Sequence, residues 1–261
     1  MNRTLFYPAI MALLLVGCRP EENPGQLNAV NQSLERVNKT INDENNLISQ
    51  HLLNTQADPQ TADIVTKWVQ RADRINRNAD SVRVMIKELK EELISQSDSL
   101  KREYVTVIRQ LYDDNGVGNQ LLKKLAAFKD SIPVIMYGEG GRDSSVAQGR
   151  VSRYLNTLLD SIPLLPGYVD SLSADQRIQY GKKWLNENFG RSSSLMAMIM
   201  LNKIENDLLL TQKILIEYCN MKVASSFCGY NVFHVITSLS SSYVKRGQEI
   251  EGKIKIEQPA S

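Results

Sequence analysis

Apolar residues recur along most of the chain at the spacing of an amphipathic α-helix. The first stripe alternates steps of three and four residues and consists of Leu27, Val30, Leu34, Val37 and Ile41. A heptad stripe of this kind packs either within one chain or as a parallel seam between two copies, and both interpretations stay open here. Pro20, Pro24 and Gly25 disfavour helix, so we expect the first helix to start near Gln26.

Later apolar stretches predict further helices. A long helix follows the break at Asp58 and Pro59 and runs from about Thr61 toward Leu111, with a kink or break expected at residues 95–99. Shorter helices fit residues 117–128, 151–159 and 174–188, with Gly190 as the C-cap of the last of these and residues 192–194 as N-caps of the next helix. Segment 195–218 is strongly apolar and free of proline. It predicts a central, well-buried helix.

The last part of the chain changes its period. Ile250, Gly252, Ile254 and Ile256 alternate with charged residues, which is typical of a half-buried strand. Residues 232–236 are a second strand candidate. Two or three strands are not stable alone, so we expect them to pack on the helices, to open a further domain, or to accept a strand from a partner along their unpaired edge.

The predicted fold class is mainly α: a multi-helix bundle with long antiparallel helices and a short C-terminal β-hairpin or strand stub. We divide the chain into a signal peptide (1–17), a tether (18–26), a helical bundle (27–228) and a strand stub (229–261).

The N-terminus predicts a lipid anchor. Residues 5–17 carry no charge, but at about 1.5 Å per residue they are too short to span a bilayer core of about 30 Å. They have the length of the apolar region of a signal peptide. The segment Leu15-Val16-Gly17-Cys18 resembles the bacterial lipobox, which implies cleavage before Cys18 and attachment of fatty acyl chains such as palmitate. Several acyl chains hold a protein firmly on a membrane.

The composition of the chain argues against several classes of function. The chain has 31 Lys and Arg against 29 Asp and Glu, so its formal charge is +2, and it lacks the basic stripe of an electrostatic nucleic-acid binder. Its two histidines, His51 and His234, have no partners at metal-ligand spacing. The glycine-rich segment 138–143 lacks the Lys-Ser/Thr of a phosphate-binding loop. We therefore predict no catalytic residue, no metal and no cofactor.

Cys219 and Cys228 are the cysteines left after Cys18. An exported protein meets an oxidising environment, in which these two residues form either a disulfide across a short loop or two buried or free thiols.

Four segments, taken together and in order, resemble one family: residues 27–38, residues 68–72 with 86–94, residues 195–218, and residues 241–247 with 251–256. The family is GldM, called PorM in the type IX secretion system. The resemblance implies a periplasmic helical bundle followed by Ig-like β domains, and a dimer that joins a proton-driven inner-membrane motor to an outer-membrane ring. Here a lipobox segment without an acidic residue stands in place of the family's transmembrane helix.

These observations predict a non-enzymatic lipoprotein of the cell envelope, facing the periplasm or exposed at the surface and associated with gliding motility or type IX secretion. Its expected partners are the membrane, through the N-terminal lipid, and envelope proteins or a second copy of itself, but not nucleic acid. The alternative is a lipoprotein that binds a small ligand within the bundle, which would need an apolar pocket lined by several helices.

Overall fold

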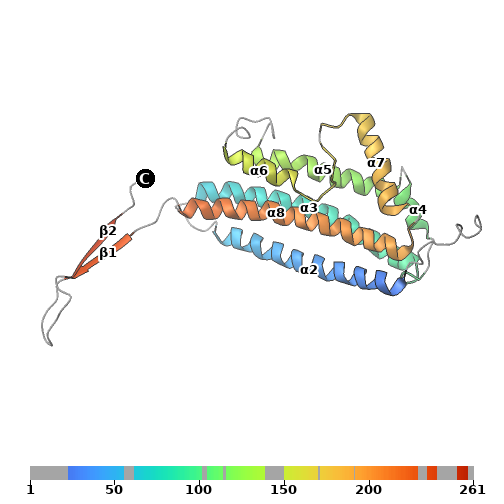
Figure 1. The fold of residues 1–261 in the computed structure, drawn as a ribbon, viewed down its shortest axis with the longest axis horizontal. Coiled ribbons are helices and arrows are strands. Elements are labelled where there is room, and N and C mark those ends of the chain that lie inside the picture. The colour runs from blue at the N-terminus through green and yellow to red at the C-terminus, as the bar shows by residue number, and fades with distance from the viewer. Residues whose placement is uncertain are drawn as a thin grey trace, which may run out of the picture. The chain divides into compact units, whose positions relative to one another are not determined.

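The computed structural model describes residues 23–55, 62–101, 105–113, 116–138, 150–169, 171–190, 192–228, 234–239 and 252–257. The helices of these residues are α2 (Pro24–Thr55), α3 (Ala62–Gln96), α4 (Thr106–Tyr112), α5 (Val117–Tyr137), α6 (Arg150–Asp160), α7 (Ala174–Phe189) and α8 (Ser194–Cys228) (Figure 1). Two strands follow, β1 (His234–Leu239) and β2 (Gly252–Glu257). The fold of the described residues is mainly helical, as the hydrophobic periodicity predicted.

The chain forms two compact units. Unit 1 comprises the residues up to Lys39 together with Ile86–Leu122 and Ser173–Asn206, and unit 2 comprises Thr40–Met85, Lys123–Leu172 and Asp207–Ser261. The helices α2, α3, α5 and α8 each contribute residues to both units.

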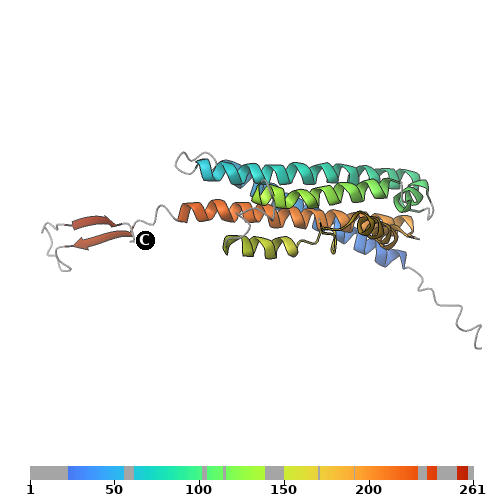
Figure 2. The same ribbon diagram turned by 90° about the horizontal axis from the view of Figure 1, so that it is seen from above.

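Helix α8 supplies core residues to each unit. Its buried apolar side chains include Leu201 and Ile204 in unit 1, and Leu208 and Leu215 in unit 2. A helix that is apolar on all sides is expected to be surrounded by other elements, and this burial confirms the central helix predicted from residues 195–218. The olive α6 lies alongside the orange α8 in Figure 2. In unit 2, the ring of Tyr218 contacts Trp68 of α3 at 5.7 Å and Tyr154 of α6 at 6.1 Å between ring centres.

Among the long helices α2, α3 and α8, two pairs run antiparallel and one pair runs parallel. In unit 2, α8 runs antiparallel to α3, because Gln212 bonds to Asn76 while Tyr218 lies on Trp68. Helix α2 also runs antiparallel to α3, to which a short connection joins it (Figure 1). Two helices that both pack antiparallel to a third one must run parallel to each other, so α2 and α8 are parallel.

Helix α2 begins at Pro24 rather than near Gln26, so the tether predicted for residues 18–26 ends earlier than expected. Proline is tolerated in the first turn of a helix, because its missing N–H would have no partner there. The Oδ1 of Asn23 accepts hydrogen bonds from the backbone N–H of Gly25 at 3.0 Å and Gln26 at 3.4 Å. Asn23 therefore acts as the N-cap.

The break expected at residues 95–99 is real, because α3 ends at Gln96 and α4 starts at Thr106. Asp98, Ser99 and Leu100 all adopt positive φ angles, which a helix does not allow. By contrast, α5 continues through Pro133 to Tyr137 and is therefore longer than the helix predicted for residues 117–128. Buried Ile132, Ile135 and Met136 anchor this last part of α5 in unit 2.

Helix α7 has the ends that the sequence predicted. Ser173 and Gln176 form a capping box at its start, and Gly190 is its C-cap. The next helix, α8, starts at Ser194, and the Oγ of Ser193 accepts a hydrogen bond from the N–H of Met196 at 3.2 Å. None of the described helices is both long enough and apolar enough to pass through a bilayer.

Strands β1 and β2 pair antiparallel, with Val235 opposite Ile256, Thr237 opposite Ile254 and Leu239 opposite Gly252. Ile250, which the period-two pattern placed in the same strand, lies outside the described residues.

Candidate functional site

The apolar stripe predicted on α2 is divided between core and surface. Ile41 is buried, and Leu27 and Leu34 are half-buried. Val30 and Val37 keep 47% and 44% of their surface exposed. The stripe therefore packs partly within the chain and leaves two valines, seven residues apart, on the surface of unit 1.

Polar side chains, which the sequence reasoning missed, hold α2 in place. Asn31, Asn38 and Asn45 are spaced by seven residues, and each is almost completely buried. We call these three residues the asparagine ladder. Their heptad spacing is visible in the sequence, but a hydrophobic pattern does not reveal it, because it counts apolar residues only.

Asn38 is the middle residue of the ladder and belongs to unit 1. Its Nδ2 donates to the backbone carbonyl of Asn202 at 2.9 Å and to Oε2 of Glu205 at 3.2 Å. Its Oδ1 accepts a hydrogen bond from Nδ2 of Asn206 at 2.9 Å. The same Glu205 oxygen forms an ion pair with Lys90 of α3. One amide thus links α2 to α8 and, through Glu205, to α3.

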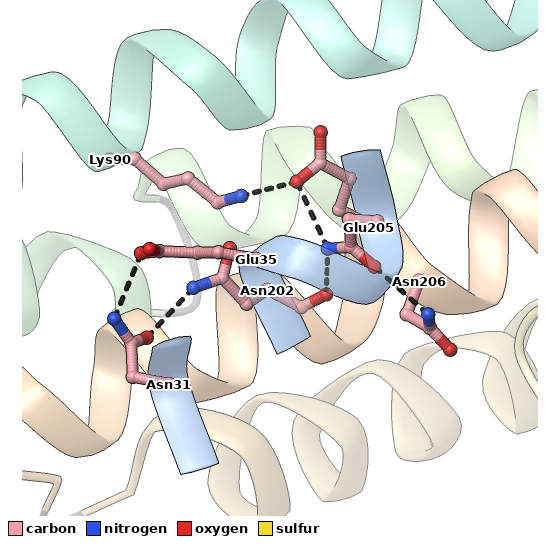
Figure 3. Close-up of polar contacts among 7 residues, drawn as sticks. Asn31, Glu35, Lys90, Asn202, Glu205 and Asn206 are labelled. Atoms are coloured by element: carbon pink, nitrogen blue, oxygen red, sulfur yellow. Dashed lines mark hydrogen bonds and ion pairs between the residues drawn. The ribbon is translucent and has the colours of Figure 1, made fainter. Parts of the chain in front are cut away.

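Asn31 extends the ladder toward the start of α2. Its Oδ1 accepts a hydrogen bond from Nδ2 of Asn202 at 2.8 Å, and its own Nδ2 donates to Oε1 of Glu35 at 2.9 Å (Figure 3). Asn202 is buried, and its Oδ1 accepts no hydrogen bond from any residue that the structure describes.

Unit 2 repeats the arrangement. Nδ2 of Asn45 donates to the carbonyl of Leu209 at 3.2 Å, and Leu209 lies seven residues after Asn202. The hydroxyl of Ser49 donates to the carbonyl of Asn45 at 2.8 Å and accepts from Nδ2 of Asn76 at 2.9 Å. Nε2 of Gln212 donates to Oδ1 of Asn76 at 2.8 Å. The same three helices are thus connected by amides and a hydroxyl.

An ion pair in unit 2 also joins α2 to α8. Nζ of Lys213 lies 2.6 Å from Oε2 of Glu44. This hydrogen bond raises the pKa of Lys213, so its ammonium form is favoured in the folded chain.

The amide side chains of this network position helices and exchange no protons, because amides do not titrate in the physiological range. Buried amides accept only partners placed at hydrogen-bonding distance, so they select one rotation and one register of a helix against its neighbours.

Cys219 is a buried free thiol, and the disulfide considered for Cys219 and Cys228 is not formed. Both residues belong to α8, which ends at Cys228. Nine residues of helix separate their Cα atoms by about 13 Å, whereas a disulfide needs less than about 7 Å. Burial also raises the pKa of the Cys219 thiol to about 12, which keeps it protonated and unreactive.

Unit 2 contains a cavity of about 270 Å³. This cavity is relevant to the alternative prediction that the helical bundle binds a small ligand. It lies between the end of α5, the end of α6 and the loop that contains Gly167. Lys129 at its edge donates to the carbonyls of Leu164 and Leu165 at 2.9 and 2.7 Å, and the hydroxyl of Tyr168 donates to Asp130 at 3.2 Å. Its polar groups thus bond within the protein and hold the loop against α5.

The remaining candidate residues are separate from this network. His51 lies on α2 and forms a hydrogen bond with Oδ1 of Asn220 at 3.0 Å, and His234 begins β1. Within the described ranges, no three His, Cys, Asp or Glu residues are grouped so that they could hold a metal ion. Cys18 and most of the glycine-rich segment 138–143 lie outside those ranges.

A family model described as the GldM N-terminal domain matches residues 26–220, which is more than half of the chain and includes the asparagine ladder. No curated protein matches the chain.

Proposed function

Because the chain belongs to the GldM N-terminal domain family, we propose that it is a non-enzymatic structural lipoprotein of the cell envelope that connects envelope partners. The family is envelope-associated and is linked to gliding motility and type IX secretion. The observation that carries the proposal is the family match over nearly the whole helical part. The amide network of α2, α3 and α8 adds support, since its side chains align helices.

Deleting the gene tests this role directly. We expect the deletion strain to lose secretion of type IX cargo or gliding on agar, and the full-length chain expressed in trans to restore it. Normal secretion together with normal gliding in the deletion strain would contradict the proposal.

The membrane attachment is proposed to run through lipid on Cys18. The support is the lipobox-like sequence that ends at this cysteine and the uncharged segment before it. The segment offers no acidic side chain for proton transfer within a membrane, so we propose a passive anchor and not a motor part. Radiolabelled palmitate should be incorporated into the wild-type chain and not into Cys18→Ser, and only the wild type should sediment with membranes.

Self-association is proposed to use the outer edge of the α2 stripe. Val30 and Val37 are both exposed, and their seven-residue spacing suits a parallel seam with a second copy. Replacing both by Glu would place charges in this seam, so the dissociation constant should rise at least about tenfold. Val84, an exposed valine of α3, provides the matched control as Val84→Glu. Equal masses of all three proteins in light scattering would exclude this seam.

The strand pair is proposed as a second contact. The sheet of the described residues consists of β1 and β2, so each strand has one edge without a neighbour in it. Such an edge can accept a strand from an envelope partner. Oligomeric state and partner capture measured with and without residues 231–261 test this contact, and identical results would argue against it.

A further inference from the structure

Two adjoining hollows in unit 1 lie where α4 packs on α7. They share Arg109 and Tyr112, both of which come from the last turn of α4. We call the two hollows together the α4–α7 groove. All of its residues belong to unit 1.

The first hollow is apolar and has a volume of about 440 Å³. Val105, Ile108 and Phe189 line it, and Ile108 and Phe189 are buried, so they form its floor. The ring of Trp184 packs edge-on against Phe189 at 5.8 Å between ring centres, which fixes this floor. A preformed apolar hollow of this kind favours a large apolar side chain.

The second hollow has a volume of about 530 Å³, and polar and charged residues line most of it. It contains two cationic side chains, Arg109 and Lys182, and one carboxylate, Asp113. Within the part of the chain that the structure describes, the guanidinium of Arg109 has no ion-pair partner. Arginine binds carboxylates through two parallel hydrogen bonds, so the charge of this hollow favours an acidic group.

Exposed apolar side chains extend beyond the hollows. Tyr112 on the rim is 50% exposed, and Ile178, one turn before Lys182 on α7, is 58% exposed. A small ligand held in the hollows would leave Ile178 in water, whereas a polypeptide lying along α7 would cover it. Tyrosine and arginine are also the residues that most often dominate protein–protein contacts.

We propose that the α4–α7 groove binds a segment of a partner protein that carries a carboxylate next to a large apolar side chain. The apolar side chain enters the hollow over Ile108 and Phe189, and the carboxylate pairs with Arg109. This inference rests on the proposed function, for which it names a docking surface and the chemistry of a partner. It involves neither the lipid on Cys18 nor the valines of α2.

Selection from a phage-displayed library of short random peptides tests the groove. The full chain is compared with Arg109→Gln, and with Arg153→Gln as the matched control, since Arg153 is an exposed arginine of α6 in unit 2. We expect peptides with Asp or Glu beside a large apolar residue to be enriched on the wild type and on Arg153→Gln. A selected peptide should bind Arg109→Gln about tenfold more weakly, and Ile178→Ser should weaken it as well.

Each outcome decides the proposal. Unchanged thermal unfolding of the variants shows that a loss of binding is not a loss of folding. The proposal would be overturned if the enriched peptides lacked acidic residues. It would also be overturned if a selected peptide bound Arg109→Gln as tightly as it binds the wild type. Displacement of a selected peptide by inorganic phosphate alone at millimolar concentration would show a simple anion site and would also overturn it. Cargo secretion in the deletion strain tests the proposed function separately, so the two failures are distinguishable.

Discussion

At the scale of single residues, burial of amides distinguishes α2 from α3. Helix α2 buries Ile41 and Leu52 as apolar side chains but also buries the three asparagines of the ladder, whereas α3 buries a continuous apolar series from Val65 to Leu93. An amide is buried at low cost only if its hydrogen bonds are made. The position of α2 therefore depends on a few hydrogen bonds with fixed directions. The hydropathy pattern of the sequence does not reveal these hydrogen bonds.

Replacing Asn38 by Ala should lower the free energy of unfolding by about 2 kcal/mol, because Glu205 and Asn206 each lose a hydrogen bond to a buried amide. Urea unfolding followed by circular dichroism measures the change. Asn28→Ala, at an exposed position of the same helix, is the control and should have little effect. Equal unfolding midpoints for the two variants would show that the ladder does not stabilise unit 1.

The buried thiol predicts how stability changes with pH. The pKa of Cys219 rises from its ordinary value near 9 to about 12 on folding. The stability that this thiol contributes is therefore complete below pH 9 and is lost as pH rises from about 9 to about 12, because the unfolded chain ionises first. Cys219→Ala should flatten this decline in urea midpoints between about pH 9 and 10.

Tyr218 also makes the folded chain less stable as the pH rises, but at higher pH than Cys219, because burial raises the pKa of Tyr218 from about 10 to about 12. Tyr218→Phe should thus flatten the decline only above about pH 10. If both variants keep the wild-type pH profile, neither group controls the alkaline loss of stability.

At the scale of elements, the sequence predicted helices well and their ends less well. The existence of a helix depends on many periodic side chains, whereas its end depends on a few local interactions. Asn23 caps α2 before Pro24, and buried side chains carry α5 past Pro133. The α4–α7 groove was beyond sequence reasoning, because its hollows combine α4 with a helix that starts more than sixty residues later.

The turn after α3 allows a matched pair of substitutions. Ser99 is exposed and has a φ of 56°, a conformation that glycine adopts without strain. Ser99→Gly should raise the free energy of unfolding by up to about 1 kcal/mol. Ser95→Gly, at an exposed position inside α3, should lower it by about 0.5 kcal/mol. Changes of the same sign in thermal unfolding would contradict the assigned turn.

At the scale of the whole molecule, the helical part should be stable without the strands. The side chains that the structure describes as buried lie between Asn31 and Val223, within the helical part. Strands β1 and β2 pair with each other, and an isolated pair of strands adds little stability of its own. Removing residues 229–261 should therefore change the melting temperature by less than about 2 °C, as followed by circular dichroism.

The reason for this expectation is that a helical bundle is stabilised by burial of its own apolar faces. If the shortened chain instead melted more than about 5 °C lower, a loss of well over 1 kcal/mol, residues 229–261 would have to bury apolar surface of the helices. In that case the strands would not be free to accept a partner strand, and the strand-addition contact would lose its basis, while the α4–α7 groove would stay testable by peptide selection.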